Sequence, residues 1–235
     1  MEQETESNAA EVLAKLREGK ELQHATVSKL TLSGEFAHPV RLDHCVVKRL
    51  RVEHATFAGG LSFRGCDLHK PHVGKEVTIE GDLDLRSTSL VRADFTGITA
   101  TGELRLDMVR TKGALRVSHS SFEGVRCWGA HFGDWVEFSK CTFRSRADYR
   151  NFHGDEGFSA KDCRFEDEFW FRGSTVSKKF ELLGSYFGGM TDFSKSKLRD
   201  VSYLEGMEQG PKQQFAFRNA LFDRVLLRPS QIQGR

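Results

Sequence analysis

Residues 141–198 decide the fold, and they read CTFRSRADYRNFHGDEGFSAKDCRFEDEFWFRGSTVSKKFELLGSYFGGMTDFSKSKL. This stretch divides into triplets such as Cys-Thr-Phe, ending at Phe143, and Cys-Arg-Phe, ending at Phe165, and successive triplets end five or six residues apart. In most triplets the outer two residues are apolar or small, whereas the middle residue is often charged. That alternation is typical of a short extended strip whose outer side chains face a core and whose middle side chain faces solvent.

The same triplet continues towards the N-terminus through most of the chain. Its third residues include Phe132, Phe122, Phe95, Phe63, Phe57 and Val27. On this interpretation Glu35 is the one charged residue in an outer position. Neither an amphipathic helix nor an ordinary strand repeats a three-residue strip every five or six residues. Because so short a strip is not stable alone, each must pair with its equivalent one coil away, about 4.8 Å along an axis.

The size of the coil follows from an alternation of small and large residues at the first triplet position. Small residues recur every eleven residues at Cys163, Ser174 and Ser185, with Phe169 and Phe180 between them. This alternation returns in register only if a coil has an even number of sides, and four sides of five or six residues give about 22 residues per coil. The sequence therefore predicts an all-β solenoid of roughly eight coils, about 40 Å long.

Several triplets resemble those of a known family. The strips A-T-F, C-T-F and C-R-F, each followed by a short polar turn, are similar to the A-x-[LF]-x-x unit of the pentapeptide-repeat family, and the resemblance extends from about Ala25 to Tyr203. It implies a right-handed quadrilateral β-helix. It also implies one candidate function, since some members of that family are DNA-mimicking modulators of a type II topoisomerase such as gyrase.

Both ends of the solenoid need caps because they expose unpaired backbone. Residues 1–20 are expected to hold a capping helix, with Asn8 and Glu11 spaced as a capping box, and residues 21–205 to form the β-helix. Residues 206–235 are expected to form a linker and a second amphipathic helix over 212–227. That helix is expected to act as a cap or, alternatively, as the contact of a homodimer, because pentapeptide-repeat proteins often associate through this end.

The composition excludes some classes of partner. A net charge of +2 gives no overall attraction to nucleic acid or to anionic membranes. No apolar run approaches the length of about twenty residues that a membrane-spanning helix needs, and the acidic start lacks the features of a signal peptide. We therefore expect a cytoplasmic protein without nucleic-acid partners or membrane insertion.

Cysteines and histidines raise the question of a metal site. Cys45, Cys66, Cys141 and Cys163 occupy the triplet position that Ala or Ser occupies elsewhere, which predicts small core residues with free thiols. His24 and His44 are expected to lie above one another with His54 on the opposite side, which favours a solvated row over a ligand set. From these residues we predict no metal site.

No cofactor or catalytic residue is predicted either. The chain lacks the short motifs of nucleotide-binding proteins, serine hydrolases and zinc proteases. Hexapeptide-repeat acyltransferases, which are enzymatic solenoids, need a strict six-residue period on three sides, whereas the mean step here is shorter. A protein without enzymatic activity is expected.

A candidate partner surface comprises outward aromatic residues and a cluster of acids. Trp170 and Tyr186 are middle residues of triplets, Trp128 and Trp135 lie near corners, and the acids within about one coil are Asp155, Glu156, Asp162, Glu166, Asp167 and Glu168. Aromatic residues are enriched at binding hot spots, so the chain is expected to be a non-enzymatic protein–protein interaction scaffold whose partner presents basic residues around an apolar pocket.

Three alternatives to this surface stay open. The aromatic side chains could simply cover the edges of the strips. A DNA mimic needs an acidic face along much of its length, which the net charge of +2 matches poorly. The chain could also be a segment of a larger membrane or signalling assembly.

Overall fold

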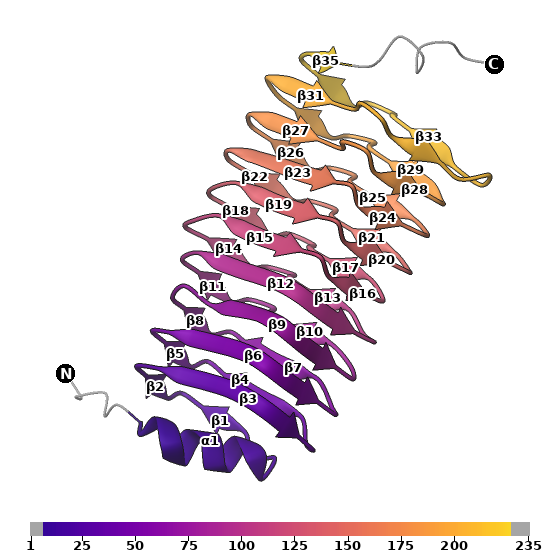
Figure 1. Ribbon diagram of the computed structural model, residues 1–235. Helices are drawn as coiled ribbons and strands as arrows, with labels where there is room; N and C mark the ends of the chain where they lie inside the picture. Colours follow the sequence, from indigo (N-terminus) through magenta and orange to yellow (C-terminus); the bar gives the residue numbers. More distant parts are fainter. Residues whose placement is uncertain (1–6, 227–235) are drawn as a thin grey trace.

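Each strip of the sequence pairs with the strip one coil later, as the computed structural model of residues 7–226 shows (Figure 1). Phe143 pairs with Phe165, twenty-two residues further along, and near the N-terminus Val27 pairs with Val47, twenty residues further along. Every strand pairing in the described part of the chain is parallel, as expected when equivalent strips of successive coils stack. The predicted all-β solenoid is confirmed.

The strips form three parallel sheets that run the length of the solenoid. The first sheet consists of β1 (Leu22–Gln23), β4 (Val40–Asp43), β7 (Leu61–Arg64), β10 (Leu83–Asp84), β13 (Leu104–Arg105), β17 (Val125–Arg126), β21 (Ala147–Asp148), β25 (Phe169–Trp170), β29 (Met190–Asp192) and β33 (Gln214–Ala216). The second sheet consists of β2 (Thr26–Val27), β5 (Val46–Val47), β8 (Asp67–Leu68), β11 (Ser89–Leu90), β14 (Arg110–Thr111), β18 (His131–Phe132), β22 (His153–Gly154), β26 (Thr175–Val176), β30 (Lys197–Leu198) and β34 (Leu221–Phe222).

The third sheet covers two sides of each coil. It consists of β3 (Leu30–Phe36), β6 (Leu50–Phe57), β9 (His72–Ile79), β12 (Ala93–Ala100), β15 (Leu115–Ser118), β16 (Ser121–Phe122), β19 (Val136–Ser139), β20 (Thr142–Phe143), β23 (Gly157–Lys161), β24 (Arg164–Phe165), β27 (Lys179–Glu181), β28 (Tyr186–Phe187), β31 (Val201–Tyr203), β32 (Glu208–Gln209) and β35 (Val225–Leu226). β12 pairs with both β15 and β16, so one long early strand corresponds to two later strips and each coil has four strips. The ten strands of the first sheet are nine steps apart from end to end, about 43 Å at about 4.8 Å per step.

Stacked phenylalanine rings fill the core. Phe122, Phe143, Phe165 and Phe187 are each 0% exposed and form one column, with ring centroids 6.1, 5.3 and 5.2 Å apart. Each ring is contributed by the same position of the coil, because the coil length brings equivalent triplets into register. The predicted inward position of the third triplet residue is confirmed for this column.

Four of the five cysteines, all except Cys127, occupy the first position of a triplet, as do several serines. Cys45, Cys66, Cys127, Cys141 and Cys163 are all buried, free thiols, and burial raises the pKa of Cys127 well above its ordinary value. The serine hydroxyls at this position donate to carbonyl oxygens of the preceding coil, Ser174 Oγ to Tyr149 O at 2.6 Å and Ser185 Oγ to Ala160 O at 3.0 Å. The prediction of core cysteines with free thiols is confirmed, although the same position also accepts a large side chain, since the buried Phe152 aligns with Ser174.

Left-handed backbone conformations turn the corners of the coils. His24, His44 and His54 have φ values of 50°, 51° and 48°, a region in which histidine is enriched among residues other than glycine. The rings of His24 and His44 stack with centroids 5.5 Å apart, whereas His54 lies beside Glu76 on the third sheet, with 3.3 Å between Nδ1 and Oε2. The predicted separation of His54 from the other two is confirmed.

The inward assignment of Glu35 is wrong. The register of β3 against β6 shifts between Leu32 and Gly34, so that Gly34 opposes Ala55 and Phe36 opposes Phe57. Glu35 is therefore a middle residue and is exposed, while Phe36 is 1% exposed. The five-residue counting failed here because the corner from Leu32 to Gly34 is one residue shorter than the equivalent corner of β6 from Val52 to Ala55.

A helix covers the first coil. α1 (Ala9–Arg17) is capped at its N-terminus by Asn8, whose Oδ1 accepts a hydrogen bond from the Ala10 N–H at 2.9 Å. Its buried residues Val12 and Leu16 join the core, and Arg17 Nη2 donates to Ser33 O at 3.0 Å. No helix among residues 7–226 is long and apolar enough to cross a membrane.

The second predicted helix is not present. In the described part of residues 212–227 the chain continues the solenoid through β33, β34 and β35. Phe215 opposes Thr191, and the Phe217 ring stacks on Phe193 at 5.6 Å between centroids, so these residues extend the existing columns. A helix would leave the open backbone edge of the preceding coil unpaired, whereas another coil satisfies it. The predicted C-terminal helix is therefore wrong within residues 212–226, and the homodimer contact expected through this end stays a prediction.

Candidate interaction face

The outward side of the first sheet carries arginine, carboxylates and tryptophan along its length. We call this surface the arginine face and define it by the middle row of the strips together with the outward residue two positions later. The middle row is Arg41, Ser62, Asp84, Arg105, Arg126, Asp148, Trp170 and Asp192, and the flanking row is Asp43, Arg64, Arg86, Asp107, Trp128, Arg150, Arg172 and Ser194. Residues two apart in an extended strip lie on one side, so the two rows are adjacent.

Most arginines of this face are held by a carboxylate on the same chain. Arg86 binds Asp84 through Nε to Oδ1 at 2.9 Å and through Nη2 to Oδ2 at 2.6 Å. Arg150 binds Asp148 in the same way at 2.9 and 2.7 Å. Burial alone would raise the pKa of Asp84, but hydrogen bonds from Arg86 outweigh it, so this pKa lies below its ordinary value. The guanidinium planes are therefore fixed before any partner arrives.

Asp107 differs from Asp84 and Asp148, because an arginine does not bind both of its carboxylate oxygens. Its Oδ1 accepts the Trp128 N–H at 3.1 Å, but its Oδ2 makes no hydrogen bond within residues 7–226, and Arg126 Nη2 lies 3.5 Å away. Burial raises the pKa of Asp107 above its ordinary value despite the nearby Arg126. An unsatisfied carboxylate oxygen thus lies beside an exposed tryptophan.

Trp170 lies between two arginines. The guanidinium carbon of Arg146 is 3.9 Å from a ring centroid of Trp170, and that of Arg150 is 4.5 Å away. Arg146 is itself bound to Glu168, with 3.0 Å between Nε and Oε2. Cation–π contacts and the two ion pairs hold the half-buried ring in one orientation.

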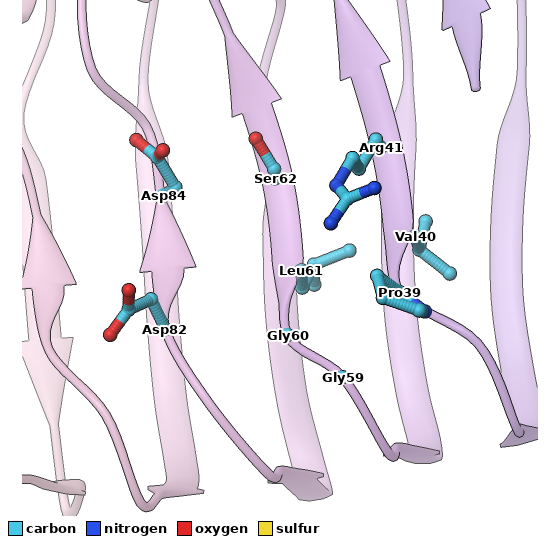
Figure 2. A pocket seen from close by; sticks show the side chains of 9 residues that line it. All are labelled: Pro39, Val40, Arg41, Gly59, Gly60, Leu61, Ser62, Asp82 and Asp84. Atoms are coloured by element: carbon cyan, nitrogen blue, oxygen red, sulfur yellow. The ribbon is translucent and has the colours of Figure 1, made fainter. Parts of the chain in front are cut away.

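Shallow hollows lie along the same face. One of about 200 Å³ lies between neighbouring strips, where Arg41 and Asp84 lie on strands on either side of Ser62 (Figure 2). Gly59 and Gly60 leave this hollow without side chains on one edge (Figure 2). A second, of about 450 Å³, is lined by Arg126, Arg146, Asp148 and Arg150, next to Trp170.

The four predicted aromatic residues do not share one surface. Trp170 and Trp128 lie on the arginine face, where Trp128 is 46% exposed and adjoins Met108, which is 45% exposed. Trp135 lies near Lys179 of β27, with 5.9 Å from Nζ to a ring centroid, and Tyr186 lies on the third sheet under Arg164 at 4.1 Å. Only the two tryptophans of the arginine face can contact one flat partner together.

The six predicted acids do not form one patch. They wrap around a single coil: Asp155 follows a strand of the second sheet, Glu156, Asp162 and Glu166 border strands of the third sheet, and Asp167 and Glu168 precede a strand of the first. Most are paired on the chain, Asp155 with His131 and His153, Glu156 with Lys178, Glu166 with Arg164 and Glu168 with Arg146. The expected acidic surface beside Trp170 is therefore replaced by a mixed surface in which arginines contact the ring.

The sequence analysis did not predict the arginine face. Its signal is the spacing Asp-x-Arg at residues 84–86, repeated at 148–150, together with arginines that recur about one coil apart at 105 and 126. Coil spacing, rather than local clustering, would have revealed it.

Comparisons with known proteins add little about activity. No family model matches the chain, and no curated protein matches it. A similar solved structure is that of QnrB1, a plasmid-mediated fluoroquinolone resistance protein, with 15% sequence identity, coverage of 90% of this chain and 93% of that chain, and a TM-score of 0.27. At this TM-score the likeness carries no argument, and the β-solenoid rests on the strand pairing described above.

Proposed function

We propose that the protein is a non-enzymatic scaffold of the pentapeptide-repeat type that binds another protein through the arginine face. The observation that carries this proposal is the fixed orientation of Trp170 between Arg146 and Arg150. Tryptophan and arginine are the residues most enriched at binding hot spots. Here Trp170 and Arg150 are half-buried, Arg146 is exposed, and all three lie on a side of the solenoid where the shallow hollows also lie.

Preorganisation supports binding by this face. An interface loses about 0.5–1.5 kcal/mol for each flexible side chain that it immobilises. Arg86, Arg146 and Arg150 already have their guanidinium groups bound to carboxylates of the chain. No lysine occupies the two rows of the arginine face in the described residues. Several cations of the face are therefore held rigidly by ion pairs, whereas Arg41, Arg64 and Arg172 are exposed.

The charge pattern indicates the kind of partner. Carboxylates such as Asp84 and Asp148 alternate with arginines along the face, so a row of phosphates would meet repulsion at every few positions. A protein surface with interleaved charges of both signs and an apolar group opposite Trp170 or Trp128 is complementary to it. We expect such a protein partner rather than nucleic acid.

The charge pattern disfavours DNA mimicry. A mimic needs carboxylates in series, but the middle row of the second sheet runs through Arg110, His131, His153, Thr175 and Lys197, and that of the first sheet contains arginines. The hollows of the arginine face are shallow and lined by ion-paired groups, which favours binding over catalysis.

Site-specific photocrosslinking tests which face meets the partner. A photoreactive amino acid replaces Ser62 on the arginine face or, as the matched control, Ser89 in the middle row of the second sheet; both positions are half-buried. In native-host extract we expect a discrete adduct from position 62 and none from position 89. An adduct from position 89 alone, or equal adducts from both, would overturn the proposal.

A further inference from the structure

Two histidines lie one above the other on the second sheet, away from the arginine face. His131 of β18 pairs in register with His153 of β22. Both are middle residues of their strips, so both side chains face outward, and their rings meet edge to face with centroids 4.8 Å apart. The parallel register brings the two imidazoles together although the residues lie twenty-two positions apart in the sequence.

The carboxylate of Asp155 completes a cluster with the two rings. His131 Nε2 lies 3.0 Å from Asp155 Oδ2, and His153 Nε2 lies 2.9 Å from Oδ1 of the same carboxylate. One ligand atom from each residue lies within 4.8 Å of the other two. Three potential ligand atoms thus converge on one point of the surface.

The backbone under this cluster is rigid. The amide groups of His131, His153 and Asp155 each donate to a carbonyl of the preceding coil, at 2.9 Å in all three cases. Beneath them the rings of Phe132 and Phe152 stack with centroids 5.1 Å apart and are almost fully buried. The three side chains therefore start from fixed Cα positions, and binding a ligand requires only small rotations about side-chain bonds.

We propose that His131, His153 and Asp155 bind a divalent transition-metal ion, with zinc as the ion of choice. Zinc takes imidazole nitrogen at about 2.0–2.1 Å and carboxylate oxygen at about 2.0–2.2 Å. Ligand atoms of a tetrahedral site are then roughly 3.3 Å apart, close to the observed nitrogen–oxygen separations. Two imidazoles with one carboxylate suit zinc, copper, nickel or cobalt rather than magnesium or calcium.

The exposure of the cluster leaves room for a further ligand. The side chains of His131, His153 and Asp155 are 43%, 45% and 43% exposed. Water or a group from a bound partner can therefore complete the coordination, as in sites with three protein ligands. Arg110 precedes His131 and Thr175 follows His153 in the same row, so one cation borders the site on one side.

The chain contains a natural control for this site. His24 and His44 also stack one coil apart, with centroids 5.5 Å apart, but both occupy corners of the coil. Asp43 lies 3.0 Å from Nδ1 of His44 on the same strip, and no carboxylate within residues 7–226 is placed between the two rings as Asp155 is between His131 and His153. Comparing the two pairs therefore shows whether a metal ion needs the shared carboxylate in addition to two stacked histidines.

Isothermal titration with zinc chloride at neutral pH tests the proposal. We expect one saturable site per wild-type chain, and no comparable binding of magnesium. His153→Asn and Asp155→Asn should each lower the zinc affinity by about tenfold or more, since even the loss of groups that only orient metal ligands costs about 10- to 100-fold. His44→Asn should leave the affinity unchanged.

Cobalt supplies a second readout that does not depend on affinity alone. Bound Co²⁺ in a four-coordinate site gives intense visible absorption, which we expect in the wild type and in His44→Asn and not in His131→Asn. Thermal melting of each variant without metal confirms that the fold is retained. Zinc binding that is equally strong in wild type and His153→Asn, or the absence of a saturable site in the wild type, would overturn the proposal.

Discussion

Replacing Phe165 with aspartate tests the assignment of inward and outward positions. Phe165 is 0% exposed, its ring stacks on Phe143 and Phe187 at 5.3 and 5.2 Å, and it packs edge-on against Phe169 at 4.9 Å. Loss of a buried phenylalanine costs about 3–5 kcal/mol, and an unpaired carboxylate in an apolar site costs several more. The total approaches the whole stability of a typical domain, about 5–15 kcal/mol. We expect that Phe165→Asp prevents the surrounding coils from forming.

The matched control is Arg164→Asp, one residue earlier. The Arg164 side chain is 52% exposed, lies 4.1 Å from the Tyr186 ring centroid and pairs with Glu166 at 3.0 Å. An exposed cation–π contact contributes about 0.5–1 kcal/mol and an exposed ion pair about 0–1 kcal/mol. The expected loss is therefore at most about 2 kcal/mol, measured by urea unfolding with circular dichroism. Equal loss of stability in the two variants would refute the assignment.

Four further predictions concern two buried carboxylates, gyrase and secondary structure. Asp84→Asn should lower the free energy of unfolding at pH 7 by about 1–3 kcal/mol. Because the pKa of Asp84 is lowered in the folded state, the stabilisation by its carboxylate is present above the unfolded pKa of about 3.9 and is lost as the pH falls through the folded pKa. The difference in unfolding free energy between wild type and Asp84→Asn, measured by urea unfolding, should therefore be smaller at pH 3 than at pH 7. Asp107→Asn should not lower stability at pH 7, since the raised pKa of Asp107 means that folding disfavours its ionised form, and a clear loss would contradict the burial argument. DNA supercoiling by gyrase should be unchanged at micromolar protein, and inhibition would restore the DNA-mimic hypothesis. Far-ultraviolet circular dichroism should show mainly β-structure with a minor helical part, and a mainly helical spectrum would refute the fold.

The solenoid could be predicted because its sequence signal is repeated many times. Triplets such as the one ending at Phe165 indicate both the spacing of the strips and which side chains face the core. Because equivalent triplets stack, the same pattern recurs in every coil. The C-terminal segment could not be assigned in this way. The apolar residues Phe217, Ala220, Leu221 and Phe222 satisfy both a helical stripe and two further strips. The deciding factor is the unpaired edge of the preceding coil, which local periodicity does not contain.

The candidate site was less predictable than the fold. The triplet pattern predicts that residues such as Trp170 point outward. The side of the solenoid on which each residue lies depends on the number of residues in the preceding coils. Coils near the N-terminus advance by twenty residues, as from Val27 to Val47, whereas Met190 pairs with Gln214, twenty-four residues further along. Around Trp170 the coil length is constant at twenty-two residues, as from Asp148 to Trp170 and from there to Asp192, so counting strips does place Tyr186, three strips later, on another side. What counting does not show is which outward side chains contact one another across coils.

The affinity of the partner for Trp170→Ala tests the central claim most directly. Tyr186→Ala is the control, since Tyr186 is also an outward aromatic under an arginine but lies on the third sheet. With the partner identified by crosslinking at position 62, titration calorimetry and thermal melting are measured on both variants. We predict that Trp170→Ala remains folded and weakens binding by about 2 kcal/mol or more, which is roughly a thirtyfold increase in the dissociation constant. Tyr186→Ala should leave the affinity unchanged. Unchanged affinity in Trp170→Ala, with only a lower melting temperature, would contradict the account and leave the ring as a cover for the strip edge.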